Sequence, residues 1–272
     1  MAENIESVKK YWEAHPTRGI WNTYEDEMAD VYVKERWMPD SMNQLPLSGS
    51  LILDVGSGQG TNLYYMLKKG ARAYGFDISE TAIASSHDKL QKGGFSPSHA
   101  FVGNAEHMPF KDNAFDCAIA LGVLHHTPNI DKAASELHRV LKPNGIACLM
   151  LYKKYTFPHF VIMGARALNR FLMRISNNKF SVFGVIKPNK TKKYGTFFHE
   201  MLTCPILRTY SKRDIRRIFS QFRRVRFQTR FTGITRIKDF LPIPPLFNKF
   251  LYWLEPKIER TLGFYQVFYL TK

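Results

Sequence analysis

Short apolar runs alternate with longer segments of helical periodicity through the first half of the chain. The apolar runs have the length of buried strands and lie near residues 50–55, 72–77, 98–102, 115–121 and 146–152. The segments of helical spacing between them lie near residues 60–69, 80–91 and 130–141. Regular alternation of strand and helix predicts an α/β fold in which a parallel sheet has helices on both faces.

The N-terminal residues are predicted to form a helical lid over this core. Aromatic and acidic side chains follow helical spacing over residues 3–14 and about 24–37. We therefore divide the chain into four parts: a lid (1–45), a core (46–152), an insertion (153–210) and a C-terminal part (211–272).

The C-terminal part is predicted to complete the sheet. Residues 211–221 have helical spacing, and Ser211 is a suitable N-cap because Asp214 follows three residues later. Strands near 223–231 and 264–270 would bring the total to seven. The expected fold is a doubly wound, mostly parallel sheet of the Rossmann-like kind.

Two segments of the C-terminal half interrupt this pattern. Residues 153–205 are basic, aromatic and irregular, and the insertion 232–262 contains the proline-rich run LPIPPL at 241–246. Ligands bind at the carboxyl ends of the strands in open α/β sheets. We therefore expect both insertions to fold over that edge.

A glycine-rich turn after the first predicted strand is the most informative motif. Three apolar residues lead to Asp54, and glycines follow at positions 56, 58 and 60. Glycine permits positive φ and lets a ligand approach the backbone closely. The spacing is G-x-G-x-G, whereas dinucleotide sites use G-x-G-x-x-G with the pyrophosphate at a helix N-terminus.

Two carboxylates narrow the choice of ligand. Asp54 would repel a pyrophosphate, but it suits a ligand that carries an amino group. Asp77, 17 residues after Gly60, ends the second strand and is placed to accept hydrogen bonds from ribose hydroxyls. An amine and a ribose without phosphate indicate S-adenosylmethionine, and NAD fits less well.

Four ordered segments resemble the class I S-adenosylmethionine-dependent methyltransferases. Within that class, the chain is similar to the ubiquinone and menaquinone C-methyltransferases and to small-molecule methyltransferases. The segments are the glycine turn with its two carboxylates and residues 102–110 (VGNAEHMPF), 115–126 (FDCAIALGVLHH) and 136–145 (ELHRVLKPNG). The resemblance covers residues 45–152.

The resemblance implies a cofactor role for each matched position. Asp54, Gly56 and Gly58 would hold the methionine part of S-adenosylmethionine, and Asp77 its ribose. Asn104 and Ala105 would lie beside the adenine, and residues 121–123 under the sulfur. The residues under the sulfur are Leu121, Gly122 and Val123. The other implied cofactor positions are Ser57, Gly60, Thr61, Asn62, Ile78 and Glu106. Either Asn104 or Glu106 could instead cap a turn.

Candidate general bases follow the fourth predicted strand. His125 and His126 lie beside the expected methyl position, and an imidazole can accept a proton from a hydroxyl or an acidic carbon. One of the pair could instead cap the next helix or face solvent. Further candidates are Tyr152 at the tip of the fifth strand, His199 and Glu200. Tyr24 would either reach the pocket from the N-terminal lid or pack as an aromatic side chain.

Composition is typical of an enzyme in a reducing compartment. The chain has 272 residues, is 44% hydrophobic and contains three cysteines without metal-ligand spacing. We therefore expect neither disulfides nor a bound metal. The acidic N-terminus lacks a secretory signal, and no apolar stretch approaches the ~20 residues of a membrane span. We expect a cytoplasmic location, either throughout or at the membrane surface.

Charge is divided unevenly along the chain. Residues 1–150 contain 14 Lys and Arg against 18 Asp and Glu, whereas residues 151–272 contain 25 against 5. The formal net charge of +16 therefore combines one part at −4 with another at +20. Such asymmetry concerns partners and surface potential rather than fold.

Three kinds of partner could explain the basic half. Phosphates of a nucleic acid would pair with the arginines over 213–226, but LGVL stands at 121–124, where base-modifying relatives carry Asn/Asp-Pro-Pro-Tyr/Phe. An anionic membrane surface would suit the mixed aromatic and basic residues over 157–183 and 240–254. A soluble anionic small molecule could be steered into a positive cleft.

Together these patterns predict an enzyme that transfers a methyl group from S-adenosylmethionine to a small-molecule or lipid-like acceptor, either anionic or associated with a membrane. Two alternatives stay open: an RNA methyltransferase that uses the basic half, and a cofactor-binding module without catalysis. An NAD-dependent oxidoreductase is the rival enzyme class.

Overall fold

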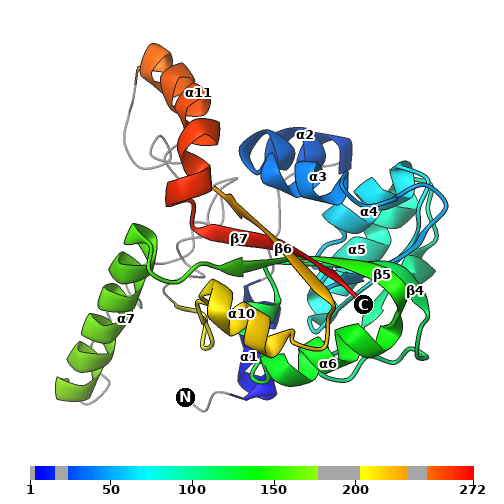
Figure 1. The fold of residues 1–272 in the computed structure, drawn as a ribbon, viewed down its shortest axis with the longest axis horizontal. Coiled ribbons are helices and arrows are strands. Elements are labelled where there is room, and N and C mark those ends of the chain that lie inside the picture. The colour runs from blue at the N-terminus through cyan, green and yellow to red at the C-terminus, as the bar shows by residue number, and fades with distance from the viewer. Residues whose placement is uncertain (1–3, 16–23, 177–202, 232–243) are drawn as a thin grey trace.

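One sheet joins strands from both halves of the chain (Figure 1). The computed structural model describes residues 4–15, 24–176, 203–231 and 244–272. Its strands are β1 (Leu51–Val55), β2 (Arg72–Asp77), β3 (Ala100–Val102), β4 (Phe115–Leu121), β5 (Leu141–Tyr152), β6 (Arg224–Arg230) and β7 (Tyr265–Thr271). Their order is β3-β2-β1-β4-β5-β7-β6, and β7 runs antiparallel to both neighbours. The predicted doubly wound, mostly parallel sheet of seven strands is confirmed.

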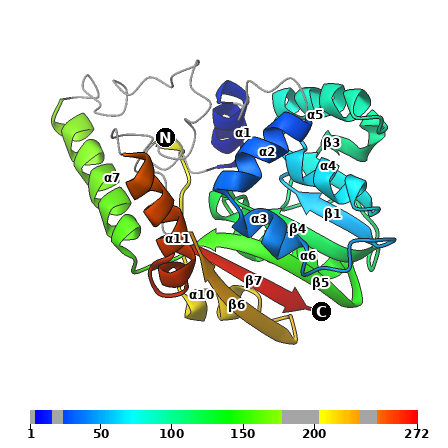
Figure 2. The same cartoon turned by 90° about the horizontal axis from the view of Figure 1, so that it is seen from above.

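Helices cover both faces of this sheet (Figure 2). One face carries α4 (Thr61–Lys68) and α5 (Glu80–Lys92), and the other carries α6 (Ile130–Val140) and α10 (Lys212–Ile218). Because successive side chains of a strand point to opposite faces, Ile52 belongs to the first layer and Leu53 to the second. Both side chains are fully buried, as expected for a parallel strand covered on both sides.

The N-terminal helices pack beside the first of these layers. They are α1 (Ile5–Ala14), which contacts α5, α2 (Tyr24–Lys34), which contacts α4, and α3 (Trp37–Met42). The single helix predicted over 24–37 is therefore wrong, because the helical run breaks at Glu35 and Arg36. Pro39 explains the break, since it has no N–H to donate to the carbonyl of Glu35.

The helix predicted after residue 211 begins with the expected cap. The hydroxyl of Ser211 accepts from the amide of Asp214 at 3.2 Å, and the Asp214 carboxylate accepts from the amide of Ser211 at 2.9 Å. This capping box satisfies two backbone donors at the N-terminus of α10. The cap prediction is confirmed, and the helix ends at Ile218, earlier than predicted.

Both insertions contain a long helix that the sequence pattern did not reveal. These are α7 (Phe157–Ile175) and α11 (Pro245–Leu262). The expectation of irregular structure is therefore wrong for residues 157–175. The candidates His199 and Glu200, and residues 241–243 of the proline-rich run, lie outside the described residues. No helix in the described ranges is long and apolar enough to cross a membrane.

The two insertion helices are attached at the same edge of the sheet. β5 ends at Tyr152 shortly before α7, and α11 ends shortly before Tyr265, the register partner of Tyr152. This is the carboxyl edge, toward which β1, β4 and β5 run (Figure 1). Both helices extend away from the sheet in the two views (Figures 1 and 2).

Candidate functional site

The turn between β1 and α4 has the conformation that its glycines predict. Gly56, Gly58 and Gly60 have positive φ values of 70°, 54° and 83°. A side chain at Gly56 would collide with both γ-methyl groups of Val123, so this position requires a bare backbone. The amide of Ser57 donates to the carbonyl of Phe76 at 2.9 Å and fastens the turn to β2.

Asp77 lies at the end of β2, directly against this turn. One carboxylate oxygen accepts from the amide of Gly58 and the other from the amide of Ser79, each at 2.9 Å. Burial raises the pKa of the Asp77 carboxyl, while these amides oppose the shift. The structure therefore brings Asp77 to the glycine turn, where its predicted ribose contact would be made.

Asp54 is a buried acid on the strand that enters the turn. Its side chain is 2% exposed, and its Oδ2 atom has no hydrogen-bond partner among the described residues. Burial first, and then the negative charge of Asp77, raise its pKa to about 8. A buried carboxylate oxygen without a partner is costly, so this site favours a ligand that brings a positively charged donor.

The end of β4 lies across the turn from these acids. Gly122 has a φ of 84°, and Val123 packs against Gly56. Leu121 is buried in the core layer that contains Ile119 and Tyr152. The three positions predicted to lie under the sulfur are thus next to the glycine turn.

Three predicted cofactor positions have side chains packed or hydrogen-bonded within the protein, although the buried Ser57 hydroxyl has no hydrogen-bond partner among the described residues. Thr61 donates to Glu27 at 2.6 Å, and the Asn62 amide oxygen accepts from the Tyr32 hydroxyl at 3.0 Å. Ser57 is packed so closely on β2 that a side chain at Gly75 would collide with it. Any contact of these three residues with a cofactor stays a prediction.

The loop after β3 is stabilised by its own polar side chains. Asn104 accepts from the amide of Glu106 at 2.9 Å. Glu106 in turn accepts from the Thr127 hydroxyl at 2.6 Å and from the amide of Asn129 at 2.8 Å. Both residues therefore have the turn-capping role that the sequence left open, and the adenine contacts of Asn104, Ala105 and Glu106 stay predictions.

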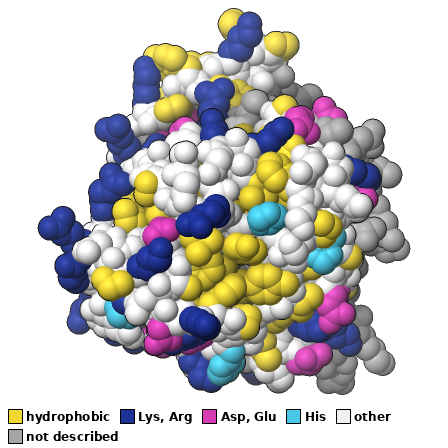
Figure 3. Space-filling view, turned by 90° about the vertical axis from the view of Figure 1, so that its right-hand side faces the viewer, with side chains coloured by type: hydrophobic (Ala, Val, Ile, Leu, Met, Phe, Trp, Pro, Cys, Tyr) yellow, Lys and Arg dark blue, Asp and Glu magenta, His cyan; other side chains and the backbone are white. Residues whose placement is uncertain are grey.

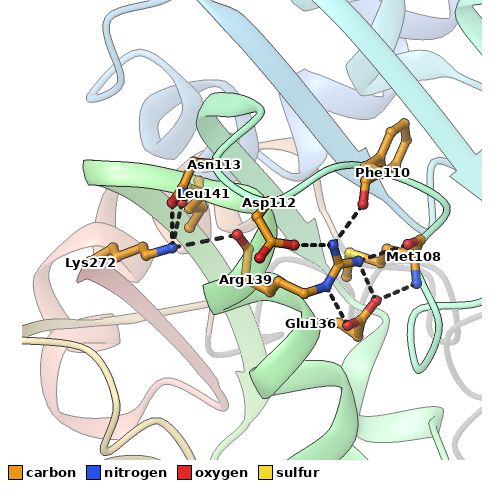
Figure 4. Close-up of polar contacts among 8 residues, drawn as sticks. All are labelled: Met108, Phe110, Asp112, Asn113, Glu136, Arg139, Leu141 and Lys272. Atoms are coloured by element: carbon orange, nitrogen blue, oxygen red, sulfur yellow. Dashed lines mark hydrogen bonds and ion pairs between the residues drawn. The ribbon is translucent and has the colours of Figure 1, made fainter.

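Arg139 holds the far end of the same loop against α6 (Figure 4). Its guanidinium donates to the carbonyls of Met108 and Phe110 at 2.9 and 2.6 Å. It also pairs with Glu136 and Asp112 at 2.7 and 2.8 Å, and Arg139 lowers the pKa of the Glu136 carboxyl. Glu136 also accepts from the amide of Met108, so the loop is tied to the helix at several points.

His125 is the most deeply buried of the candidate bases. It is 0% exposed, and neither of its ring nitrogens has a hydrogen-bond partner among the described residues. Burial first, and then His126, hold its pKa well below 6.5, so the imidazole is neutral at neutral pH. A neutral, unpaired imidazole can accept a proton.

The other two predicted catalytic residues surround this ring. The centroid of the His125 ring is 4.0 Å from that of Tyr152 and 4.2 Å from that of His126. Nδ1 of His126 lies 2.7 Å from the carbonyl oxygen of Ile206, which can only accept a hydrogen bond. Tyr152 stacks on Phe264 at 4.8 Å. The structure therefore brings the three predicted catalytic residues together, and their role in catalysis stays a prediction.

The lid reaches the glycine turn through contacts that the sequence did not reveal. The Tyr24 hydroxyl donates to the carbonyl of Gln59 at 2.8 Å, so this side chain holds the backbone of the turn while its ring stacks on Tyr64. Glu27 accepts from Thr61 and forms a buried ion pair with Lys89. In the sequence, Glu27 stands out only as an acidic residue near the start of a predicted helix. That position usually indicates helix capping rather than a contact with a site.

The first lid helix also contacts the candidate site. Trp12 packs edge-on against His126, with ring centroids 5.3 Å apart. Glu13 accepts from the amides of Glu80 and Thr81 at the N-terminus of α5. α1 therefore covers both the histidine pair and the helix that follows Asp77.

A family model for the methyltransferase domain matches residues 53–149. This range includes the glycine turn, both buried acids and the two histidines. Over this range the chain is similar to methyltransferases. A ubiquinone/menaquinone biosynthesis C-methyltransferase of Bartonella tribocorum is 40% identical to it over 104 residues, which are 36% of this chain and 40% of that protein.

Solved structures share the fold of the methyltransferase domain and its additions. A possible histamine N-methyltransferase of Thermotoga maritima has a TM-score of 0.54 at 15% identity, over 92% of this chain and 96% of its own. A phosphoethanolamine N-methyltransferase of Haemonchus contortus, solved with S-adenosylhomocysteine, has a TM-score of 0.51 at 16% identity, over 83% and 49%. The family model and the relatives confirm the predicted resemblance to S-adenosylmethionine-dependent methyltransferases, among them the ubiquinone and menaquinone enzymes, and the chain spans about 40% of the length of the Bartonella tribocorum relative.

Proposed function

We propose that this chain transfers a methyl group from S-adenosylmethionine to a small-molecule or lipid-like acceptor. The observation that carries the proposal is the unpartnered carboxylate oxygen of Asp54, buried beside a bare glycine turn. The match of residues 53–149 to a methyltransferase domain supports the same chemistry. A protein of similar fold, from Haemonchus contortus, binds S-adenosylhomocysteine.

The residues present fit this cofactor. Asp54 would receive the ammonium group of its methionine part, and Asp77 would accept hydrogen bonds from its ribose. The turn that holds Gly56 and Gly58, both at positive φ, would bring its backbone close to the part of the cofactor between these two groups. When bound, the cofactor supplies a methyl group on a positively charged sulfur, which is already an activated donor. The protein therefore acts mainly by aligning the acceptor and by excluding water.

His125 is the residue we assign as proton acceptor. An acceptor hydroxyl or acidic carbon must lose a proton as it gains the methyl group, and a nearby neutral imidazole can take that proton. Tyr152 and His126 fix the His125 ring by packing against it. His126 is oriented in turn by the carbonyl of Ile206.

A lipid-like or small acceptor is favoured over a nucleic-acid base. The chain has LGVL at 121–124, whereas methylation of an exocyclic base nitrogen goes with a different tetrapeptide. The Bartonella tribocorum relative is named for quinone biosynthesis, and quinones of that kind are lipid-like.

Methyl transfer to fractionated cell extract tests the proposal. The protein is incubated with S-adenosylmethionine labelled on its methyl group and with separate lipid, nucleic-acid and polar-metabolite fractions. We expect label in the lipid or metabolite fraction, and none with an Asp77→Ala control. Label in RNA would support the alternative acceptor, and cofactor binding without label in any fraction would support a binding module.

A further inference from the structure

The outer side of α7 is apolar, which reverses the usual arrangement of a surface helix. Large apolar side chains recur every three or four residues and therefore share one side of the helix. They are between 53% and 82% exposed and comprise Phe157, Phe160, Val161, Leu168, Phe171 and Ile175. We call this surface the α7 stripe.

Polar side chains on the inner side of α7 help to fix its orientation. His159 and Asn169 are buried there together with the apolar Ile162. Nδ1 of His159 lies 3.0 Å from the Thr209 hydroxyl, and Arg166 donates to the carbonyl of Cys204 at 2.9 Å. These polar contacts hold the inner side of α7 against the protein. The α7 stripe therefore faces outward in the native structure.

The first turns of α11 present a second apolar surface. Leu246 is 81% exposed and Trp253 is 58% exposed. The rings of Phe247 and Phe250 stack on each other, and Trp253 lies against Phe250. The ammonium group of Lys257 lies over the Trp253 ring, so a basic group adjoins the exposed aromatic cluster.

The charge beside the stripe has a single sign. α7 contains three arginines and no acidic residue over its 19 residues. Arg170 and Arg174 are exposed along its flank. An apolar face flanked by arginines is complementary to an interface where acyl chains lie beneath anionic headgroups.

Both helices are attached next to the candidate site. Tyr152, which packs on His125, precedes α7 by five residues, and Phe264, which stacks on Tyr152, follows α11 by two. A surface that binds both helices would therefore lie at the edge of the sheet where the proposed acceptor enters.

We propose that the outward faces of α7 and α11 dock this protein on an anionic lipid surface. The proposal deepens the proposed function and rests on it in one respect, because it identifies the acceptor as a lipid or a molecule dissolved in the membrane. Docking itself requires no methyl transfer, so the two claims can fail separately.

The opposite edge of the sheet does not combine exposed apolar side chains with charge of a single sign. Where β1 and β4 begin, Leu51, Tyr74 and Phe110 line a shallow apolar hollow. Figure 3 views the molecule from that side and shows hydrophobic side chains gathered among both basic and acidic ones. Mixed charge gives no preference for an anionic surface, so this edge serves as the internal comparison.

Co-sedimentation with vesicles tests the docking. The protein is mixed with vesicles of phosphatidylcholine alone, or of phosphatidylcholine with phosphatidylglycerol, in the absence of cofactor. We expect binding only to the anionic vesicles, with affinity falling as salt is added. Arg170→Glu should weaken the affinity by at least about fivefold, the value expected for loss of one basic charge at the surface. Lys111→Glu, the same change at the opposite edge, should leave it unchanged.

Two further variants test the apolar part of the surface. Leu168→Asp with Phe171→Asp should abolish vesicle binding without lowering the melting temperature, because both side chains are exposed in the folded protein. Vesicle binding should also shift tryptophan emission to the blue, and Trp253→Phe should remove most of that shift.

Three results would overturn the proposal: wild-type vesicle binding by Arg170→Glu and by the Leu168→Asp, Phe171→Asp double variant, no binding to anionic vesicles, or a dimer that the same aspartates dissociate. The melting temperature with S-adenosylhomocysteine, measured on the same samples, tests the proposed function separately.

Discussion

At the scale of single residues, Asp54 is an acid that the fold buries without a partner for one oxygen. Its pKa of about 8 in the folded chain lies above the ordinary value of 3.8. The folded protein therefore keeps a proton that the unfolded chain has released between these pH values. The free energy of unfolding should consequently fall as pH rises through this window, by at most about 1.4 kcal/mol per pH unit.

Asp54→Asn should reduce this pH dependence because the amide does not ionise. Urea titrations between about pH 5 and pH 8 measure the effect, with Asp40→Asn, at an exposed carboxyl, as the matched control. Equal slopes for Asp54→Asn and the wild type would show that Asp54 titrates as an ordinary acid.

His125 yields a kinetic prediction at the same scale. His125→Ala should lower kcat by about 10²-fold or more while the affinity for S-adenosylhomocysteine is retained, because a base acts on the acceptor. Because the pKa of His125 is held below 6.5, the acidic limb of the wild-type rate profile should also lie below that pH. The control is His107→Ala, at an exposed histidine. The base assignment fails if His125→Ala keeps the wild-type kcat.

The site residues that the sequence predicted are those whose position in the fold follows from their spacing along the chain. Gly56 must be bare because Val123 faces it, and Asp77 lies beside the turn because adjacent parallel strands end at one edge. Trp12 and Glu27 were not predicted as site neighbours. Their partners lie far away in the sequence, and nothing local to a helix shows which distant group it will contact.

At the scale of elements, α2 is held to the glycine turn and α5 by a buried ion pair. The side chains of Lys89 and Glu27 are 10% and 6% exposed, and Lys89 also donates to the Gln59 side chain at 2.9 Å. Lys89→Met should therefore cost about 3–5 kcal/mol of unfolding free energy, because it leaves the Glu27 charge buried alone.

The matched double variant separates pairing from packing. Lys89→Met combined with Glu27→Leu should recover most of the loss, since no buried charge is left without a partner. Urea unfolding of the two variants measures this difference. A single variant as stable as the wild type would show that the pair does not fix the lid.

Elements that bury their apolar residues were predicted well, and α7 was not. β1 is a short apolar run buried on both faces, α6 buries one side at helical spacing, and both were placed within a few residues. In α7 most large apolar residues face outward and the inner side mixes Ile162 with the polar His159 and Asn169, so a search for a buried apolar stripe misses it. The function proposed for α7 therefore explains why its pattern is unusual.

At the scale of the whole molecule, the two functional surfaces lie at one edge of the sheet. The buried acids and histidines form the candidate site there, and α7 and α11 extend from the same edge with exposed apolar and basic side chains (Figure 1). The division of charge seen in the sequence, −4 against +20, follows the same arrangement, since the cofactor core lies in the acidic part. An acceptor held in a lipid surface would thus reach the site without leaving that surface.

Calorimetric titration of the protein with S-adenosylhomocysteine, with NAD run alongside, tests the central claim most directly. The account predicts saturable binding of one S-adenosylhomocysteine per chain, strongly weakened by Asp77→Ala, and no binding of NAD. Saturable binding of NAD, with no heat from S-adenosylhomocysteine, would contradict it.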